Sequence, residues 1–325
     1  MLLDIGILLL GLALVVFGSE WLVDGSSDVA RRSGISEFII GLTIVGIGTS
    51  TPEMVVSFLG AIKGNVDISI GNVVGSNIFN TLMILGCTAL ILPLTITQHA
   101  IKRDIPINLG VTLLLILLGC CDHGPDDRLS RIDGVIMLLI FAGYMYMSLK
   151  EGRVEETVDL QSGTVDAAAV KSKYKSPVIP VLMIIGGLAA LVFGGRLFVD
   201  SAVSIAHSLN WSDKFIGITI LAGGTSLPEL ATCIVAAFKK KGDLALGNIL
   251  GSNISNILLI LGGSALIRPL PMNNISFVDM GTLFMSALFI FVSYYTFEKR
   301  KLGRVEAVCL LLMEAAYMYV LIRNL

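Results

Sequence analysis

The chain has 325 residues, of which 54% are hydrophobic and only 15% charged, and its formal net charge is -2. Such a composition is typical of proteins that fold in a lipid bilayer and excludes an ordinary soluble domain. The basic residues lie in short clusters between apolar runs rather than on one face, so there is no reason to expect a nucleic-acid partner. Composition therefore predicts that the lipid bilayer is the main partner.

The cysteines give no sign of a metal centre. They lie in or beside apolar segments, at Cys87, Cys120, Cys121, Cys233 and Cys309. Their spacing lacks a metal-ligand pattern such as CxxC, so we expect neither a zinc site nor a disulfide framework, and no cofactor. The first apolar run carries Asp4 and has no small-residue cleavage site, so we expect it to remain as the first helix.

Apolar windows follow one another along the chain. A hydrocarbon core of ~30 Å needs about 20 apolar residues per crossing helix. Ten windows of this kind centre near Ala13, Thr49, Ser76, Leu115, Leu139, Gly187, Thr225, Ser252, Leu288 and Leu312. The sequence thus predicts an all-α polytopic membrane protein with a first five-helix unit at 1–149, a polar cytoplasmic connecting loop at 150–176 and a second five-helix unit at 177–325.

The basic residues predict the orientation of these helices. Cytoplasmic loops of membrane proteins collect lysine and arginine. If the N-terminus lies outside, most of the 23 basic residues fall in the predicted inner loops. We therefore predict a multi-pass protein of the plasma membrane, the inner membrane in a bacterium, with both termini outside.

An internal repeat divides the chain in two. Gly48-Thr49-Ser50-Thr51-Pro52-Glu53 recurs 176 residues later as Gly224-Thr225-Ser226-Leu227-Pro228-Glu229. The same offset places Gly71–Asn80 on Gly247–Asn256, and 23 of 47 positions are identical between Ile40–Gly86 and Ile216–Gly262. A unit with an odd number of spans enters the membrane from opposite sides in its two copies. We therefore predict two inverted five-helix repeats, with a site near the midplane where the interrupted segments meet.

The two glutamates of the repeated motif are the expected centre of that site. A carboxylate inside an apolar span costs about 2.5 kcal/mol or more and normally faces a partner, an ion or water. Neither Glu53 nor Glu229 has a basic residue within its own motif. Two facing carboxylates repel each other unless a cation lies between them, and oxygen ligands suit sodium and calcium rather than softer metals.

The prolines and the neighbouring polar residues complete the prediction. Because proline has no amide hydrogen, Pro52 and Pro228 should leave the carbonyl oxygens of Gly48 and Gly224 free at a break in the helix. On the next span Asn72, Ser76 and Asn80 form one polar stripe at helical spacing, repeated by Asn248, Ser252 and Asn256. Asn80 and Asn256 are the expected ligands of the stripe. The glycines Gly71, Gly75, Gly247 and Gly251 are expected to serve helix packing.

At these motifs the sequence resembles the sodium/calcium exchanger family of the cation/calcium antiporter superfamily, in its bacterial type with two alpha repeats. The resemblance implies that Glu53 and Glu229 coordinate calcium with help from the main chains of Thr49 and Thr225. It further implies that the glutamates hold sodium together with Ser50, Ser76, Ser226 and Ser252, and that the carbonyls of Gly46 and Ala222 are ligands. The segment 150–176 is too short to hold a regulatory domain.

The function that follows is secondary active exchange of calcium for sodium by alternating access, without enzyme activity and without a required oligomer. Two amides, at Asn80 and Asn256, argue against potassium cotransport, because the resemblance implies an Asp at one of these positions in potassium-dependent relatives. A proton-coupled calcium or cation antiporter stays open. A cation channel would lack dependence on a counter-ion, and an intramembrane enzyme would need two dissimilar carboxylate environments.

Overall fold

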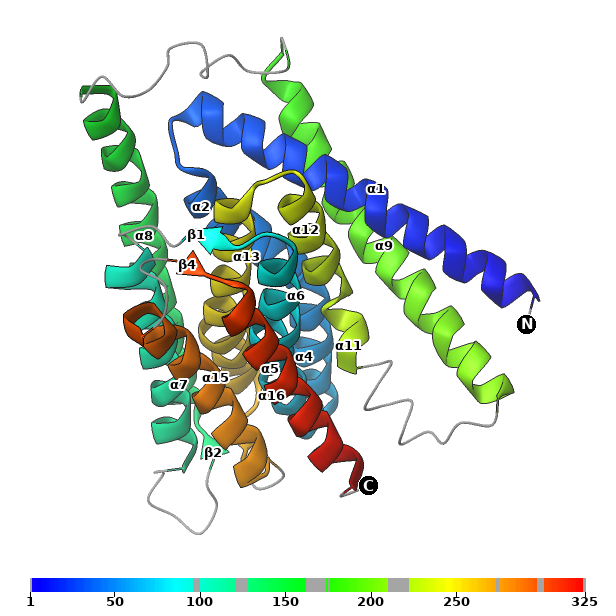
Figure 1. The fold of residues 1–325 in the computed structure, drawn as a ribbon. Coiled ribbons are helices and arrows are strands. Elements are labelled where there is room, and N and C mark those ends of the chain that lie inside the picture. Colours follow the sequence, from blue (N-terminus) through cyan, green and yellow to red (C-terminus); the bar gives the residue numbers. More distant parts are fainter. Residues whose placement is uncertain are drawn as a thin grey trace.

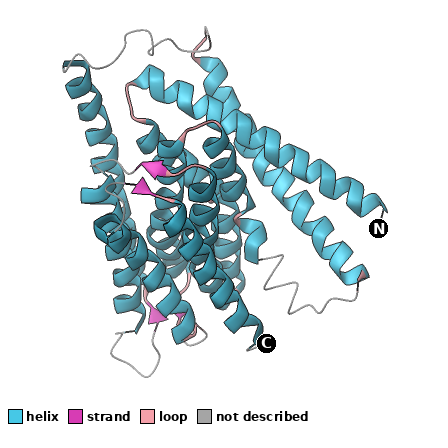
Figure 2. Cartoon of the chain, viewed as in Figure 1, coloured by secondary structure: helices cyan, strands magenta, loops and turns pink. Residues whose placement is uncertain are grey.

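The computed structural model describes residues 2–95, 100–120, 128–161, 174, 176–209, 222–272, 275–296 and 301–323. Helices dominate these residues, and the strands among them are four short ones that form two pairs (Figures 1 and 2). The predicted all-α class is confirmed.

The elements follow the same order in the two halves of the chain, with η marking π-helical segments. The first half contains α1 (Leu2–Ser33), α2 (Glu37–Ile40), η1 (Gly41–Val45), α3 (Gly46–Thr49), α4 (Thr51–Lys63), α5 (Val66–Phe79), η2 (Asn80–Ile84), α6 (Leu85–Ile91), β1 (Leu94–Thr95), η3 (Ala100–Asp104), α7 (Ile105–Cys120), β2 (Arg128–Leu129) and α8 (Arg131–Gln161). The second half contains α9 (Val178–Ser208), α11 (Ala222–Thr225), α12 (Leu227–Phe238), α13 (Gly242–Ser255), η5 (Asn256–Leu261), α14 (Gly262–Ile267), β3 (Leu270–Pro271), α15 (Phe277–Thr296), β4 (Lys301–Leu302) and α16 (Arg304–Arg323).

The predicted count of ten crossing helices is not confirmed. Among the described residues six helices are long and apolar enough to cross a membrane, or seven when the bent pair Glu37–Thr49 and Thr51–Lys63 counts as one span. The other three predicted windows fall on shorter helices: α7 with 16 residues, α12 with 12 residues, and the apolar part of α15 at Phe277–Ser293. The window near Thr225 extends into residues 210–221, which lie outside the described residues. Helix α8 continues beyond the predicted loop boundary to Gln161.

Helices α1 and α9, which the repeat offset relates to each other, pack side by side and run antiparallel (Figure 1). A Cβ atom added at Gly11 would lie 2.8 Å from the carbonyl oxygen of Gly194, and one added at Gly18 would lie 2.8 Å from that of Gly187. The order of contacts is thus reversed between the helices. Small residues let the two backbones approach closely, as in other membrane helix pairs.

The strand pairs repeat this reciprocal pattern. β1 pairs antiparallel with β4, and β2 pairs antiparallel with β3, so each pair joins one strand from each half of the chain. Figure 1 shows the pair of β1 and β4 well separated along the helical bundle from β2. Equivalent segments of the two halves therefore lie toward opposite ends of the molecule.

The helices that carry the polar stripes are the most enclosed ones. Within the spans Gly242–Ile267 and Val66–Ile91, 94% and 67% of the apolar window is buried, against 28% for the span of α1. Gly247 and Gly251 lie directly against the carbonyl oxygens of Phe38 and Leu42, which confirms their packing role. Gly71 and Gly75 meet nothing within 4 Å among the described residues, and the corresponding partner segment, 214–218, lies outside them. The stripes on these spans therefore face protein rather than lipid.

Candidate cation site

A break in the helix places Glu53. Ser50, with φ -76° and ψ 9°, ends α3 and precedes α4, and the helices on its two sides are bent by 46°. Pro52 lies in the first turn of α4, where its missing amide hydrogen breaks no bond within α4 itself. Glu53 follows in the same turn and is fully buried.

The second half builds the same break around Glu229. Ser226, with φ -86° and ψ 9°, stands between α11 and α12, and Pro228 lies in the first turn of α12. Glu229 is 1% exposed. The local sequence thus produces twice a helix start that carries a buried carboxylate.

The two motifs exchange hydrogen bonds. Ser50 Oγ donates a hydrogen bond to Glu229 Oε1, and Ser226 Oγ donates one to Glu53 Oε1. Both hydrogen bonds have a length of 3.0 Å. Each serine therefore satisfies one oxygen of the carboxylate from the other half. This brings the glutamates, predicted from positions 176 residues apart, into one site.

Several buried oxygen atoms of the two glutamates and of the predicted ligand residues have no hydrogen-bond partner among the described residues. They are Glu53 Oε2, Glu229 Oε2, Ser76 Oγ, Asn80 Oδ1 and Asn256 Oδ1. Buried polar atoms without partners are rare and costly, and each of these oxygen atoms has a lone pair that it can donate to a cation. Carboxylate, hydroxyl and amide oxygens together form the ligand set that sodium and calcium prefer.

The amide nitrogens of the two candidate ligand asparagines are engaged elsewhere. Asn256 Nδ2 donates to Asn77 Oδ1 over 3.0 Å, and Asn80 Nδ2 donates to Asn253 Oδ1 over 3.3 Å. The π-helical segments η2 and η5 begin at Asn80 and Asn256. π-Helical turns within α-helices are frequent at functional sites.

The threonine side chains of the motif form hydrogen bonds to asparagines of the other half. Thr49 Oγ1 donates to Asn248 Oδ1 over 3.1 Å, and Thr225 Oγ1 donates to Asn72 Oδ1 over 3.4 Å. Asn72 in turn donates to the carbonyl oxygen of Glu53 over 3.2 Å. Asn72 and Asn248 therefore bridge the two halves, and the threonine side chains are occupied there.

The predicted backbone ligands have different surroundings. The carbonyl oxygen of Gly46 accepts a hydrogen bond from Ser252 Oγ over 3.1 Å, which joins two of the expected ligands. Ala222 begins α11, and its side chain lies outside the described structure.

The prediction that Gly48 offers a free carbonyl oxygen is wrong. Thr51 Oγ1 donates to this oxygen over 2.7 Å and replaces the amide hydrogen that Pro52 lacks. The equivalent of Thr51 in the second half is Leu227, which has no hydroxyl to offer Gly224. Asn77 and Asn253 are not among the residues predicted for the site, although both belong to the repeated Gly-Ser-Asn motif.

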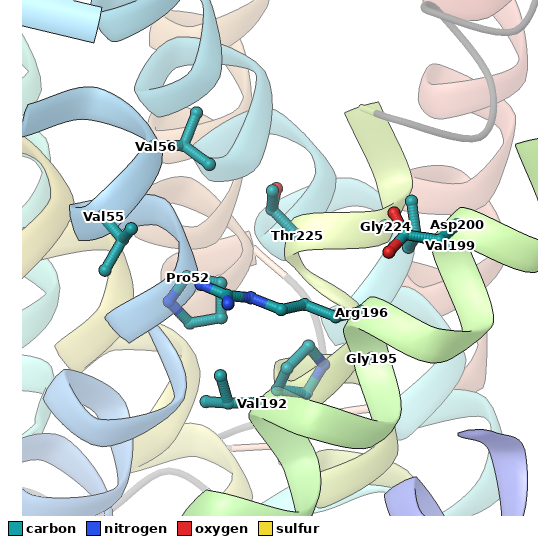
Figure 3. A pocket seen from close by; sticks show the side chains of 11 residues that line it. Pro52, Val55, Val56, Val192, Gly195, Arg196, Val199, Asp200, Gly224 and Thr225 are labelled. Atoms are coloured by element: carbon teal, nitrogen blue, oxygen red, sulfur yellow. The ribbon is translucent and has the colours of Figure 1, made fainter. Parts of the chain in front are cut away.

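A cavity lies beside the two helix breaks. It has a volume of about 200 Å³, and its lining comes from α4, α9, α11 and α12, with Pro52 and Pro228 among the lining residues. Figure 3 shows Arg196 reaching from α9 toward Pro52, while Asp200 lies beside Gly224. An ion that enters through this cavity arrives next to both helix breaks.

The described residues contain no group of three or more histidine, cysteine, aspartate or glutamate side chains able to hold a metal ion. The charge of the site is thus carried by Glu53 and Glu229 within the described part of the chain. Hydroxyl, amide and backbone oxygens must supply the remaining ligands of any bound cation.

Comparison with known proteins gives consistent matches along the whole chain. The family model described as sodium/calcium exchanger protein matches residues 3–150 and 179–323. The chain is 36% identical to the putative antiporter CaxA of Alkalimonas amylolytica, over 96% of this chain and 97% of the relative. It is 33% identical to the sodium/calcium exchanger MaX1 of Methanosarcina acetivorans, over 97% of each chain. A solved structure of the sodium-calcium exchanger NCX_Mj superposes with a TM-score of 0.81 at 34% identity, covering 98% of this chain and 97% of that one.

Proposed function

Because the chain belongs to the sodium/calcium exchanger family, a family of membrane antiporters and not of enzymes, we propose that it exchanges calcium for sodium by alternating access. The observation that carries the proposal is the buried pair Glu53 and Glu229 with its reciprocal serine bonds. We propose that the buried, unpartnered oxygen atoms of Ser76, Asn80 and Asn256 supply part of the remaining coordination.

The charge of this pair explains why transport is coupled. Two buried carboxylates without a cation repel each other and are poorly solvated, so moving the empty site across a low-dielectric barrier is unfavourable. One calcium ion or two sodium ions cancel the charge of Glu53 and Glu229. The loaded site therefore changes its access far more readily than the empty one, and a third sodium ion would make the exchange electrogenic.

The proposed ligand set follows the two halves of the chain. It comprises the side chains of Glu53, Glu229, Ser50, Ser226, Ser76, Ser252, Asn80 and Asn256, the main chains of Thr49 and Thr225, and the carbonyl oxygens of Gly46 and Ala222. Pro52 and Pro228 of the two helix breaks line the cavity, together with Thr225 of this set.

The structure supports access from one side at a time. The cavity lies at the starts of α4 and α12, where these helices meet α9. At the other end of α12, Lys239 Nζ lies 2.7 Å from Asp24 Oδ1 of α1 and ties that helix to the site-bearing part of the chain. We propose that α1 and α9 slide together across α4, α5, α12 and α13 to open the second side while the first closes.

We further propose that the chain forms ten crossings in two inverted five-helix repeats, at 1–149 and 177–325, joined by a cytoplasmic segment at 150–176. The antiparallel packing of α1 against α9 and the reciprocal strand pairs support this arrangement. An inverted repeat places chemically equivalent ligands on both sides of a central site.

Calcium-45 uptake into vesicles that hold the purified protein tests the function. The vesicles are loaded with sodium or with choline at fixed pH, and potassium is absent. We expect uptake that requires internal sodium and falls to background in Glu53→Gln and Glu229→Gln, because each change removes half of the charge that holds calcium. Uptake driven by a proton gradient alone would support the proton-coupled alternative instead.

A matched control is Glu314→Gln in α16. Glu314 is also a buried carboxylate in an apolar helix, with 4% of the residue exposed, and it lies outside the proposed ligand set. It should leave sodium-dependent uptake intact. Loss of uptake in this variant as well would mean that removing any buried carboxylate disturbs the protein, and the assignment of the site would lose its support.

A further inference from the structure

Resting on the proposed function, we infer that Asn77 and Asn253 are positioning residues that orient the amide groups of Asn256 and Asn80, so that oxygen and not nitrogen faces the cation. All four side chains are buried, with at most 2% of each residue exposed. An asparagine amide presents an acceptor oxygen at one end and a donor NH2 group at the other. Rotation by half a turn would therefore replace an attractive ligand with a repulsive one.

A chain of hydrogen bonds determines the orientation of Asn256. Asn77 Nδ2 donates to the backbone carbonyl oxygen of Asn253 over 3.0 Å, and a carbonyl oxygen is able only to accept. The other end of the Asn77 amide is therefore its oxygen, and this oxygen must receive a donor. Asn256 Nδ2 supplies that donor over 3.0 Å, which turns Asn256 Oδ1 away from Asn77. This oxygen is one of the buried atoms without a hydrogen-bond partner.

The orientation of Asn80 rests on a different anchor. Asn253 Oδ1 accepts from Asn80 Nδ2 over 3.3 Å, and Asn253 Nδ2 donates to Thr81 Oγ1 over 2.8 Å. A hydroxyl is able both to donate and to accept, so it could bond either end of the Asn253 amide. It therefore fixes the orientation of this amide less strongly than a carbonyl oxygen does. The residue equivalent to Thr81 in the second half is Ile257, which has no hydroxyl. The orientation of the Asn256 amide is therefore fixed more strongly than that of the Asn80 amide.

Each positioning asparagine thus acts on one ligand, and the pairing crosses the repeat: Asn77 acts on Asn256, and Asn253 acts on Asn80. Neither positioning residue needs to touch the ion. Partners that orient a metal ligand in this way are typically worth about 10- to 100-fold in metal affinity.

A carboxylate offers the means to test orientation apart from packing. Its two oxygen atoms are equivalent, so a ligand aspartate has no wrong orientation to prevent. Asn77→Ala should raise the calcium dissociation constant about 10- to 100-fold in the wild-type background. In the Asn256→Asp background, Asn77→Ala should alter the calcium dissociation constant less than about threefold. A double-mutant cycle of these two substitutions measures the difference directly.

The matched control exchanges the partners. Asn253→Ala should also weaken calcium binding. The same loss of affinity should appear in the Asn256→Asp background, because Asn253 does not orient Asn256. In the Asn80→Asp background the loss should disappear. Three results would each overturn the inference. They are an equal loss of calcium affinity in every background, recovery of that affinity by either aspartate regardless of pairing, and no loss of affinity in Asn77→Ala.

Calcium binding to the purified proteins is measured by titration calorimetry with calcium alone, and the melting temperature of each variant checks its folding. If Asn77→Ala fails to fold, Thr81→Val replaces it: this isosteric change should weaken calcium binding in the wild-type background and have no effect in the Asn80→Asp background. Because the calorimetry needs no sodium, the outcome is separate from that of the uptake assay. Calcium binding without sodium-dependent uptake would count against the proposed exchange and leave the test of the asparagines intact.

Discussion

Ser50 and Thr51 are adjacent hydroxyl residues with different partners. Ser50 Oγ donates to Glu229 Oε1, whereas Thr51 Oγ1 donates to the carbonyl oxygen of Gly48. We expect Ser50→Ala to raise the calcium concentration for half-maximal uptake about tenfold, because hydrogen bonds to charged groups contribute about 1.5–3 kcal/mol. Thr51→Leu copies Leu227 of the second half and should change this calcium concentration less than about threefold, since a membrane hydrogen bond outside the site averages about 0.6 kcal/mol.

Sodium-dependent calcium-45 uptake over a range of calcium concentrations measures both variants, and their melting temperatures serve as the folding control. A large effect of Thr51→Leu together with a small effect of Ser50→Ala would contradict this division of roles.

At the residue scale, the repeat was sufficient to predict the two glutamates and their serines, and the structure places these side chains together. Spacing along one helix did not reveal Asn77 and Asn253, because they lie off the stripe of Asn72, Ser76 and Asn80. Their importance depends on how two enclosed helices dock against each other. Contacts of that kind arise from tertiary packing and have no period in the sequence.

At the scale of the element, the helix break at Ser50 is the feature that aims Glu53 into the site. A proline inside a continuous helix costs about 3 kcal/mol, and here the chain bends by 46° instead. Pro52→Ala restores an amide hydrogen able to bond the carbonyl oxygen of Gly48. We expect the variant to have a straighter helix and an unchanged or higher melting temperature. Sodium-dependent uptake should be at least tenfold slower, because straightening the helix moves the Glu53 carboxylate away from its hydrogen-bond donor Ser226.

Pro106→Ala is the control, because Pro106 lies in the first turn of α7 and outside the proposed site. It should preserve uptake. If Pro52→Ala kept full activity, the bend would not be what positions the carboxylate.

Hydropathy windows predict most of the long helices but do not detect breaks within an apolar segment. Seven of the expected windows coincide with helices or a bent pair long enough to cross a membrane. The windows that are not confirmed fall on the shorter helices α7, α12 and α15. The window of α12 also contains the break at Ser226 and extends into residues 210–221, which lie outside the described residues. A window average responds to composition and is insensitive to a break that one proline and one serine create.

The whole molecule raises the question of how many times the chain crosses the membrane. An even number of crossings leaves both termini on one side, whereas seven crossings would place them on opposite sides. The proposed ten crossings are an even number, and the antiparallel packing of α1 against its repeat equivalent α9 supports the inverted repeat from which this number follows.

We therefore predict that single cysteines introduced as Leu3→Cys and Ile322→Cys both react with a membrane-impermeant thiol reagent on intact cells. These positions are 75% and 43% exposed, so burial does not protect them. The background replaces the native cysteines, with Cys233→Ser copying its repeat equivalent Ser57. Lys240→Cys, in the turn between α12 and α13, should react only after lysis, because the basic residues predict a cytoplasmic position. Labelling of one terminus without the other would require an odd number of crossings, and the proposed inverted repeat would then fail.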